Sequence, residues 1–215
     1  AKCSYLSVVG NDPTADLARE QLKKHSVNSF LLDDSSRPTT FKKRYIVDNQ
    51  KLFRVTRLEE HLLNKSIEEQ LLDRISMLGP EINGIVISDF MYGVITPRVI
   101  KHVKEIAETY NIKLFGDVQC SSQVGSILKF NDFYLLTPNE REARIALQDK
   151  VSGIEHISQS ILSITKTTSL VLKLGSSGFI AYENIDLNSN CLGQHFPALC
   201  VNPIDTAGAG DSLIS

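Results

Sequence analysis

The sequence alternates short apolar runs with amphipathic segments along most of its 215 residues. Apolar runs of strand length occupy residues 5–10, 82–90, 113–120, 133–138 and 169–175. Between them lie segments with helical periodicity, such as 96–110, in which Val99, Val103, Ile106 and Tyr110 fall on one helix face. This alternation predicts βαβ units and a mostly parallel sheet, so the expected fold class is α/β.

The carboxyl ends of the predicted strands are where we expect a binding site. In open parallel sheets, ligands bind beyond these ends. Asp89, Asp117, Asn139 and Gly175 lie at or directly after the ends of four apolar runs. This edge of the sheet is therefore the predicted location of the site.

Local signals predict where two of the helices begin. Thr96 has the character of an N-cap, and Pro97 suits the first helical position. Further along, Thr137 is predicted as an N-cap, followed by Pro138 at the first helical position and Glu140 at the third, which together make a capping box.

Asn139 and Glu142 have no structural explanation in this prediction, although both lie within one helical turn at the mouth of the sheet. A carboxylate at such a place can hold magnesium through water, because Mg²⁺ keeps much of its hydration shell. The pair is therefore a candidate metal site.

The segment LKLGSSGF, residues 172–179, follows a strand with two glycines separated by small polar residues. Two interpretations remain open. The segment is an ordinary hairpin turn, or it lets a flat nucleotide approach the backbone.

The segment PIDTAGAGDS, residues 203–212, has four very small residues between two aspartates, Asp205 and Asp211. Gly208, Ala209 and Gly210 can present consecutive backbone N–H groups, and at the start of a helix such groups bind an anion. Asp211 would then lie against that anion, where it can accept a proton from an attacking hydroxyl. The alternative is a flexible loop with an aspartate near a helix start.

One segment interrupts the alternation of strands and helices. Residues 37–57 contain β-branched and aromatic residues in two runs around DNQ, which predicts a hairpin. The segment carries seven Lys or Arg residues against the single Asp48, whereas the whole chain has a net charge of −2. It is either an edge hairpin protected by charge or an electropositive flap over an anionic ligand.

Several classes of protein are excluded by what the sequence lacks. The net charge of −2 does not favour binding of nucleic acid or membrane by the chain as a whole, and no apolar run approaches the roughly 20 residues of a membrane helix. No P-loop motif is present. The four cysteines have no zinc-type spacing, so we expect reduced thiols in a cytoplasmic protein. The abrupt ends of the sequence predict that it is a piece of a longer protein.

Three of these motifs resemble those of one known family, the ribokinase-like (PfkB) carbohydrate kinases. DTAGAGDS is similar to the family's D-T-x-G-A-G-D signature, TPNEREA to its N-x-x-E motif, and LKLGSSG to its nucleotide loop. The stretches VVGND, RPTTFKKRYIVDNQKLFRVTR and ISDFMYGVITPR resemble the heptose-phosphate kinase domain of ADP-heptose synthesis proteins. The resemblance implies a three-layer α/β/α sandwich with a hairpin lid, in one kinase domain over residues 1–215 with residues 37–57 as the lid insertion.

The resemblance also implies a phosphoryl-transfer site. Asp211 would be the base that activates a sugar hydroxyl, and the N–H groups of the three residues before it would form an anion hole. Magnesium would be held by Asn139 and Glu142, and a monovalent cation such as K⁺ near Asp205. The residues expected to bind ATP are Asn139, Lys173, Gly175, Ser176 and Gly178.

The predicted lid would contribute the substrate contacts, with Arg37, Lys42 and Arg44 meeting a sugar phosphate. It is also a plausible edge for homodimer formation. Two positions depart from the heptose kinases, in which lysine is usual where this chain has Tyr92 and Gln119. These departures leave the specificity for a particular sugar or sugar phosphate open.

Three functional hypotheses follow. The first is ATP-dependent phosphorylation of a sugar or sugar phosphate. The second is a regulatory protein that binds nucleotide or sugar without turnover, favoured by the Tyr92 and Gln119 replacements and opposed by the intact Asp211. The third is nucleic-acid binding through the basic hairpin, which would depend steeply on salt and is opposed by the excess acidity of the rest of the chain.

Overall fold

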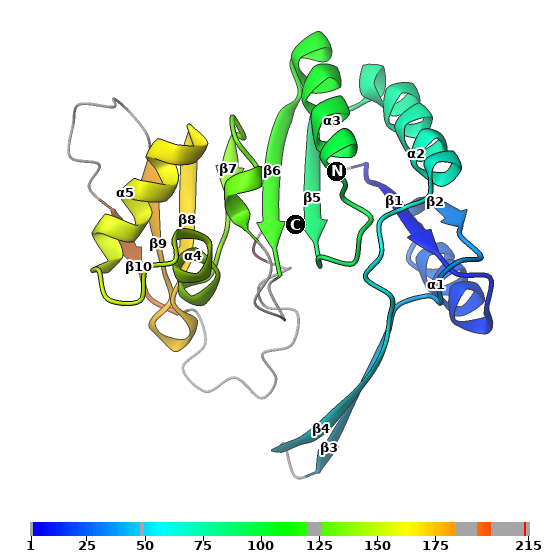
Figure 1. The fold of residues 1–215 in the computed structure, drawn as a ribbon, viewed down its shortest axis with the longest axis horizontal. Coiled ribbons are helices and arrows are strands. Elements are labelled where there is room, and N and C mark those ends of the chain that lie inside the picture. Colours follow the sequence, from blue (N-terminus) through cyan, green and yellow to red (C-terminus); the bar gives the residue numbers. More distant parts are fainter. Residues whose placement is uncertain (1, 48–49, 120–125, 184–192, 199–212, 214–215) are drawn as a thin grey trace. The chain divides into compact units, whose positions relative to one another are not determined.

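The computed structural model describes residues 2–47, 50–119, 126–183, 193–198 and 213 (Figure 1). The chain folds into two compact units. Unit 1 comprises residues 1–80 and 92–103, and unit 2 comprises residues 81–91 and 104–215. That the whole chain acts as one kinase domain stays a prediction.

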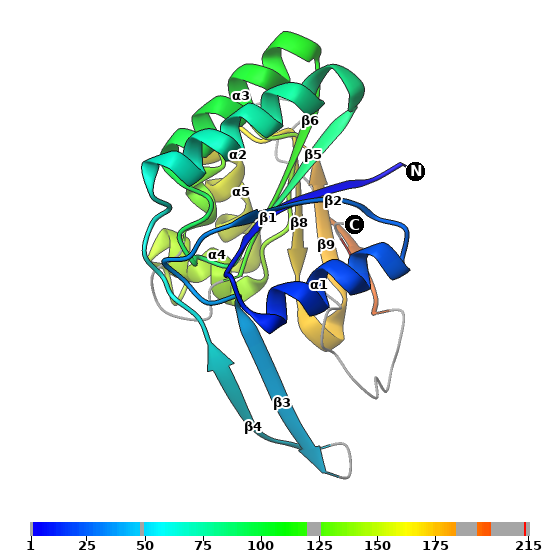
Figure 2. The same cartoon turned by 90° about the vertical axis from the view of Figure 1, so that its right-hand side faces the viewer.

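Unit 1 is built around a pair of parallel strands. Its elements are β1 (Ser4–Val9), α1 (Pro13–Lys24), β2 (Asn28–Asp33), β3 (Phe41–Val47), β4 (Gln50–Arg57), α2 (Lys65–Leu78) and the first half of α3 (Pro97–Tyr110). β1 pairs with β2 over their whole lengths, and α1 and α2 both contact β2 (Figure 2). Helix α1 begins where the Asp12 carboxylate accepts the N–H groups of Thr14 and Ala15.

The predicted hairpin is confirmed. Strands β3 and β4 pair antiparallel from Phe41 opposite Arg57 to Tyr45 opposite Phe53, after which the register shifts. The hairpin extends away from β1, β2 and α1 as a two-stranded ribbon (Figure 2).

Unit 2 contains a six-stranded sheet in the order β10-β9-β8-β7-β6-β5 (Figure 1). Its strands are β5 (Gly84–Asp89), β6 (Lys113–Val118), β7 (Leu135–Leu136), β8 (Ser169–Lys173), β9 (Phe179–Glu183) and β10 (Gln194–Phe196). Its helices are the second half of α3, α4 (Glu140–Leu147) and α5 (Ile154–Thr165), and the 3₁₀ turns η2 (Ile127–Lys129) and η3 (Gly175–Ser177) also belong to it. A further 3₁₀ turn, η1 (Gly79–Glu81), begins in the sequence of unit 1 and ends in that of unit 2. Strands β5 to β8 are parallel, and β9 and β10 are antiparallel additions. The predicted mostly parallel sheet is therefore confirmed.

One face of this sheet forms the core of unit 2. Leu136, Leu170 and Leu172 are fully buried on it, as are Ile157 and Ile161 from the helix α5 that packs against β8. Burial of such side chains contributes roughly 1.5–3 kcal/mol each. This packed layer fixes the strands whose carboxyl ends carry the polar residues described below.

The start of α3 is as predicted, because the Thr96 hydroxyl accepts the Val99 N–H at 3.1 Å and Pro97 is the first helical residue. Of the predicted apolar face, Val99 and Val103 are buried, Ile106 is half-buried and Tyr110 is exposed. Within the described ranges, no helix combines the length and apolar character needed to cross a membrane.

Candidate active site

Helix α4 begins two residues later than the sequence predicts. Its N-cap is Asn139, whose Oδ1 accepts the Glu142 N–H at 2.9 Å. Glu142 Oε2 accepts the Asn139 N–H in return at 2.8 Å. The predicted capping box of Thr137 and Glu140 is therefore wrong, and the two residues assigned to magnesium form the capping box themselves.

The late helix start has a tertiary cause. After β7 the chain remains extended, because the Thr137 N–H donates to the Gly116 carbonyl and Pro138 O accepts the Lys173 N–H. The Thr137 hydroxyl is also engaged, since it donates to Asp117 Oδ1 at 2.9 Å. Only at Asn139 does the chain become free to turn into a helix.

A buried carboxylate lies at the end of β6. Asp117 is 1% exposed, and its Oδ1 accepts hydrogen bonds from the Thr137 hydroxyl and from Lys173 Nζ, the latter at 2.8 Å. Its Oδ2 is buried without a hydrogen-bond partner among the described residues. Buried polar atoms normally have partners, so this oxygen marks a place where a donor or a cation is expected.

Lys173 joins the ends of three strands. It lies at the end of β8, its backbone forms a bridge to Asn139, and its ammonium bonds to Asp117 at the end of β6. The structure therefore brings together two of the predicted ATP-binding residues, Asn139 and Lys173, beside Glu142 at the carboxyl edge of the sheet.

A second lysine–aspartate pair lies at the end of β5. Lys129 Nζ donates to Asp89 Oδ2 and contacts Met91 Sδ at 3.4 Å. Asp89 Oδ1 accepts the Met91 N–H at 2.8 Å, which folds the chain back into a turn with Met91 at φ +63°. The sequence singled out Asp89 as the end of a strand but gave no signal for Lys129, which arrives from a separate turn.

The segment 172–179 is a hairpin turn between β8 and β9. Leu174 N–H donates to Gly178 O at 2.8 Å, and Gly178 N–H donates to Gly175 O at 3.1 Å. Gly178 has φ +88°, and an added Cβ would lie 2.0 Å from Phe196 O. This turn gives Gly178 a structural role, and the hairpin interpretation is confirmed. Gly175, Ser176 and Gly178 remain predicted nucleotide contacts.

Arg37, predicted to meet a sugar phosphate, is buried inside unit 1. Its Nε donates to Asp34 Oδ2 at 2.8 Å, Nη1 to Tyr92 O at 2.9 Å and Nη2 to His61 O at 2.9 Å. Asp34 is 1% exposed and Arg37 is 7% exposed. The guanidinium thus ties three loops of unit 1 together at the base of the hairpin.

Asp34 is the charged partner that makes this cluster possible. Burial raises the pKa of its carboxyl, but hydrogen bonds from Ser36 and Arg37 outweigh that effect and hold the pKa below its usual value. The Ser36 hydroxyl and N–H donate to Oδ1 at 2.6 and 2.9 Å, which leaves Oδ2 for Arg37. Asp34 is therefore ionised in the folded protein at neutral pH.

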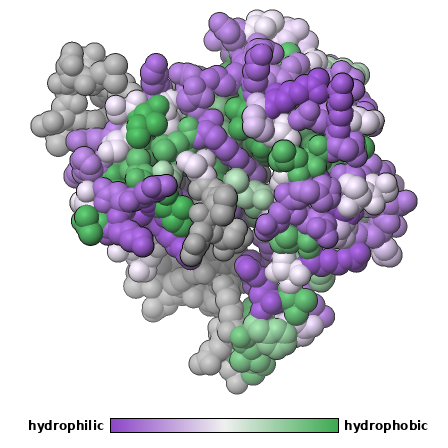
Figure 3. All heavy atoms as spheres, viewed as in Figure 1, coloured by the Kyte–Doolittle hydropathy of each residue, from purple (hydrophilic) through white to green (hydrophobic). Residues whose placement is uncertain are grey.

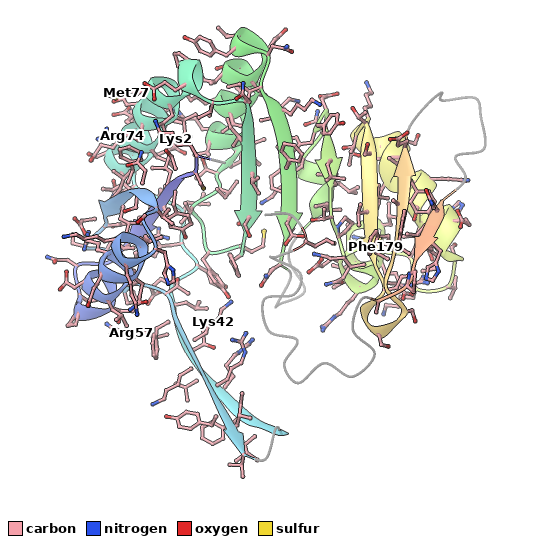
Figure 4. The ribbon with its side chains drawn as sticks, turned by 180° about the vertical axis from the view of Figure 1, so that it is seen from behind. Lys2, Lys42, Arg57, Arg74, Met77 and Phe179 are labelled. Carbon is pink, nitrogen blue, oxygen red and sulfur yellow. The ribbon has the colours of Figure 1, made fainter. Side chains whose placement is uncertain are left out.

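Lys42 and Arg44 lie on β3 at successive positions of one face of the hairpin. Lys42 is half-buried, and its Nζ lies 5.0 Å from the centroid of the Tyr92 ring. Arg44 is exposed and lies one step further from the base. Figure 4 shows Lys42 and Arg57 near the end of the hairpin that joins the rest of unit 1.

The predicted catalytic residues Gly208, Ala209, Gly210 and Asp211, and Asp205 at the predicted monovalent-cation site, lie outside the described residues. Within the described part of the chain, no three His, Cys, Asp or Glu side chains gather into a metal cluster.

The chain is 30% identical over 214 residues to the bifunctional protein HldE of Campylobacter jejuni, an alignment that covers 98% of this chain and 42% of that protein. It is 28% identical over 219 residues to the bifunctional protein HldE of Helicobacter pylori strain P12, with 100% and 45% covered. The chain thus spans less than half the length of these curated relatives.

Solved structures share the fold. Ribokinase from Giardia lamblia superposes with a TM-score of 0.77 at 16% identity, covering 98% of this chain and 64% of that one. Phosphofructokinase-2 from Escherichia coli, in complex with fructose-6-phosphate, gives a TM-score of 0.73 at 16% identity, covering 98% and 67%. These likenesses confirm the ribokinase-like fold class. The model of the pfkB family carbohydrate kinases matches residues 1–215, so the resemblance carried by the three motifs is confirmed and the chain belongs to this family of carbohydrate kinases.

Proposed function

We propose that the protein phosphorylates a hydroxyl of a sugar or sugar phosphate at the expense of ATP. The observation that carries the proposal is the gathering of Asn139, Glu142 and Lys173 at the carboxyl edge of the sheet in a member of this family. Phosphoryl transfer needs positioning and charge stabilisation more than covalent chemistry. An edge lined by fixed cations and backbone groups suits that demand.

The catalytic residues in this proposal belong to the GAGD segment. Asp211 accepts the proton of the attacking sugar hydroxyl, and the N–H groups of Gly208, Ala209 and Gly210 stabilise the charge on the transferring phosphoryl group. Lys173, Gly175, Ser176 and Gly178 line the ATP site. A monovalent cation such as K⁺ would be held near Asp205.

The described residues fit the use of magnesium together with ATP. Mg²⁺ is usually held through one or two carboxylates, water and substrate phosphates rather than by a cage of protein ligands. Glu142 and Asn139 would hold it, and the buried Asp117 Oδ2 provides a further carboxylate oxygen without a donor among the described residues. The ion, when bound, neutralises phosphate charge.

Arg37 has a different role in this proposal from the one that its sequence position suggests. Its guanidinium is bonded to Asp34 and to two backbone carbonyls, so Arg37 positions the base of the hairpin. Lys42 and Arg44 remain the candidates for contact with substrate.

The direct test is ATP-dependent release of ADP by the full-length protein with magnesium, over a panel of free sugars and sugar phosphates that includes heptose 7-phosphate. We expect a substrate-dependent signal that Asp211→Asn abolishes while ATP binding is nearly unchanged. Near wild-type turnover in Asp211→Asn would show that Asp211 is not the base. ATP binding without turnover across the panel would favour the alternative, a regulatory protein that binds nucleotide or sugar.

The hairpin supports a second element of the proposal, a homodimer. Phe41, Tyr45, Phe53 and Val55 alternate along one face of the hairpin and are exposed, and Tyr45 stacks on Phe53 with 4.4 Å between ring centroids. Apolar side chains on the hairpin are visible at the lower end of Figure 3. A two-stranded ribbon is marginal by itself in water, and a second copy would cover this face with its own.

Sedimentation of the full-length protein tests the homodimer. Phe53→Lys should shift a dimer to monomer, and an unchanged sedimentation coefficient would exclude this face as the interface.

We expect the enzyme to work in the cytoplasm, where its nucleotide is supplied.

A further inference from the structure

The carboxylate of Asp117, at the end of β6, is paired through only one of its two oxygens. Oδ1 accepts the Thr137 hydroxyl at 2.9 Å and Lys173 Nζ at 2.8 Å, and the side chain is 1% exposed. Oδ2 is buried as well, yet it has no hydrogen-bond partner among the described residues. Both oxygens of an ionised carboxylate are acceptors, and buried acceptors normally have partners. Asp117 can therefore take a second partner, a donor or a cation, that the described part of the chain does not provide.

A second buried carboxylate lies on the neighbouring segment. Glu142 is 6% exposed and its Oε2 accepts the Asn139 N–H, while the Asn139 backbone forms a bridge to Lys173. Thr137, whose hydroxyl bonds to Asp117, lies just before this segment. One ammonium thus serves an edge that carries two buried carboxylates. The remaining negative charge favours a further cation at this edge, because buried charges are normally paired.

The Lys173 ammonium already stands where such a cation would bind Asp117. We propose that it acts as a built-in counter-ion, which in the nucleotide-free protein holds Asp117 and keeps a free divalent cation from binding there. When ATP binds, the ammonium transfers from Asp117 to a phosphate oxygen and leaves Asp117 available to the magnesium ion that accompanies the nucleotide. Lys173 is then a positioning residue that makes metal binding depend on nucleotide. The inference rests on the proposed kinase function and adds the order in which that site is filled.

The chemistry of lysine suits this exchange. Its ammonium is a compact charge with three donors on a flexible stem, and the Lys173 side chain is 16% exposed whereas that of Asp117 is 1% exposed. A free divalent cation would have to displace the ammonium from a buried partner and would be repelled by it. A nucleotide instead brings phosphate oxygens that accept the ammonium. Mg²⁺ is itself usually held by one or two carboxylates together with substrate phosphates, so both changes favour joint binding of metal and nucleotide.

The experiment measures metal binding by the full-length, nucleotide-free protein. The probe is Mn²⁺, which prefers the same oxygen ligands as Mg²⁺, and the readout is the electron paramagnetic resonance signal of the free ion. We expect Lys173→Met to bind Mn²⁺ about 10- to 100-fold more tightly than the wild type, because a like charge close to a divalent ion has been removed. Adding Asp117→Asn to Lys173→Met should abolish the gain, which assigns the new site to Asp117.

Two controls separate charge from structure. Lys173→Arg keeps the positive charge and should bind Mn²⁺ as weakly as the wild type. Lys104→Met breaks an ion pair of similar length, since Lys104 Nζ lies 2.7 Å from Asp132, but the two side chains are 30% and 50% exposed. An exposed carboxylate is well hydrated and its ion pairs are weak, so we expect no new Mn²⁺ site in Lys104→Met.

The transfer to phosphate has its own measurement. Calorimetry with ATP in the presence of a chelator gives the dissociation constant of the metal-free nucleotide. Lys173→Met should weaken it about 10-fold, as expected for loss of one charged hydrogen bond, whereas Lys104→Met should leave it unchanged. Unchanged binding of metal-free ATP in Lys173→Met would show that the ammonium does not move to the phosphates.

Lys173→Met leaves a buried carboxylate without its partner and is therefore destabilised, so its fold is checked by circular dichroism. A second comparison does not depend on this variant. The double variant Asp117→Asn with Lys173→Met has neither buried charge, and we expect the nucleotide-free wild type to bind Mn²⁺ no more tightly than this double variant does.

Three results of the metal titrations would overturn the inference: Mn²⁺ binding by the nucleotide-free wild type that the double variant lacks, a folded Lys173→Met that binds Mn²⁺ no better than the wild type, or an equal gain in Lys104→Met. None of these measurements depends on turnover, so such a failure leaves the proposed function intact. Conversely, the expected gain in Lys173→Met without any ADP release across the panel of sugars would support this inference and count against catalysis.

Discussion

Asn139 and Glu142 cap each other across the first turn of α4, with Asn139 Oδ1 accepting the Glu142 N–H and Glu142 Oε2 accepting the Asn139 N–H. Both residues therefore have a structural role in the absence of any ligand. A role in holding magnesium would come in addition to capping. Capping requires only a side-chain oxygen that accepts a hydrogen bond, whereas holding magnesium requires the negative charge of Glu142.

Glu142→Gln separates the two roles. Glutamine also serves at the third position of a capping box, so we expect the free energy of unfolding to change by less than about 0.5 kcal/mol, as for a substitution that keeps the cap. The loss of charge should lower ATP-dependent turnover at limiting magnesium, with partial recovery as magnesium is raised. Measurement of turnover against magnesium concentration decides the point.

Asn139→Ala is the companion variant, because it removes the cap itself. It should cost about 1 kcal/mol of stability. If Glu142→Gln destabilised the protein as much as Asn139→Ala does and its turnover were insensitive to magnesium, Glu142 would be a capping residue only.

Two lysine–aspartate pairs in unit 2 have nearly equal lengths and different burial. Lys173–Asp117 is 2.8 Å long with side chains 16% and 1% exposed, and Lys104–Asp132 is 2.7 Å long with side chains 30% and 50% exposed. Asp117→Asn should destabilise by about 3–5 kcal/mol, because it leaves Lys173 without its charge partner in a buried site. Asp132→Asn should cost about 0–1 kcal/mol.

Denaturant titrations of both variants, each with the matching Lys→Met change to complete a double-mutant cycle, give the two coupling energies. Equal coupling in the two pairs would mean that burial does not strengthen the Lys173–Asp117 interaction.

The Asp34–Arg37 pair predicts how stability responds to acid. The pKa of Asp34 is lower in the folded protein than its usual value, so the pair stabilises the fold above the pKa of the unfolded chain. That stabilisation is lost as pH falls through the lowered folded value. We expect the free energy of unfolding of the wild type to decline below about pH 4.

Asp34→Asn should be less stable at neutral pH, by about 3–5 kcal/mol for a broken buried pair, and its stability should vary less between pH 4 and pH 2. If the free energy of unfolding fell with pH in parallel in the wild type and in Asp34→Asn, another group would control the response to acid. Unfolding monitored by circular dichroism at several pH values measures both curves.

Two glycines in one turn give a matched comparison. Gly178 has φ +88° and an added Cβ would meet Phe196 O at 2.0 Å, whereas Gly175 has φ +62° and an added Cβ would meet nothing within 4 Å. Gly178→Ala should therefore destabilise by about 3 kcal/mol or more, through backbone strain together with overpacking. Gly175→Ala should cost about 1–2 kcal/mol for the left-handed conformation alone. Similar thermal unfolding temperatures for the two variants would contradict this difference.

Features that depend on neighbouring residues could be predicted from the sequence, and features that depend on distant ones could not. Thr96 and Pro97 start α3 as expected, and the Thr96 hydroxyl accepts the Val99 N–H while it also donates to Glu68. Thr137 has the same local signals, yet the chain after β7 stays extended because the Thr137 N–H donates to the Gly116 carbonyl and Pro138 O accepts the Lys173 N–H. Those contacts belong to the assembled sheet and have no trace in the local pattern.

The candidate site shows the same limit. The strand ends were predictable, and so was the basic hairpin, since both depend on composition and periodicity within short segments. The engagement of Arg37 with the carbonyl of Tyr92, 55 residues away, was not. Nor was the placing of Arg54 opposite Arg44, because the register of a hairpin depends on its turn and on shifts such as the one after Tyr45.

The contact from Lys173 to Asp117 spans 56 residues and requires β6, β7 and β8 to be aligned in one register. A slip of a single residue in β6 would turn Asp117 to the opposite side of the sheet and put Gly116 or Val118 in its place, so that Lys173 would lose its carboxylate partner. If ATP binds at this edge as proposed, its affinity would report whether the central strands have paired correctly. During refolding, recovery of that affinity should lag behind the recovery of helical signal, because local helices form before long-range strand pairing is complete.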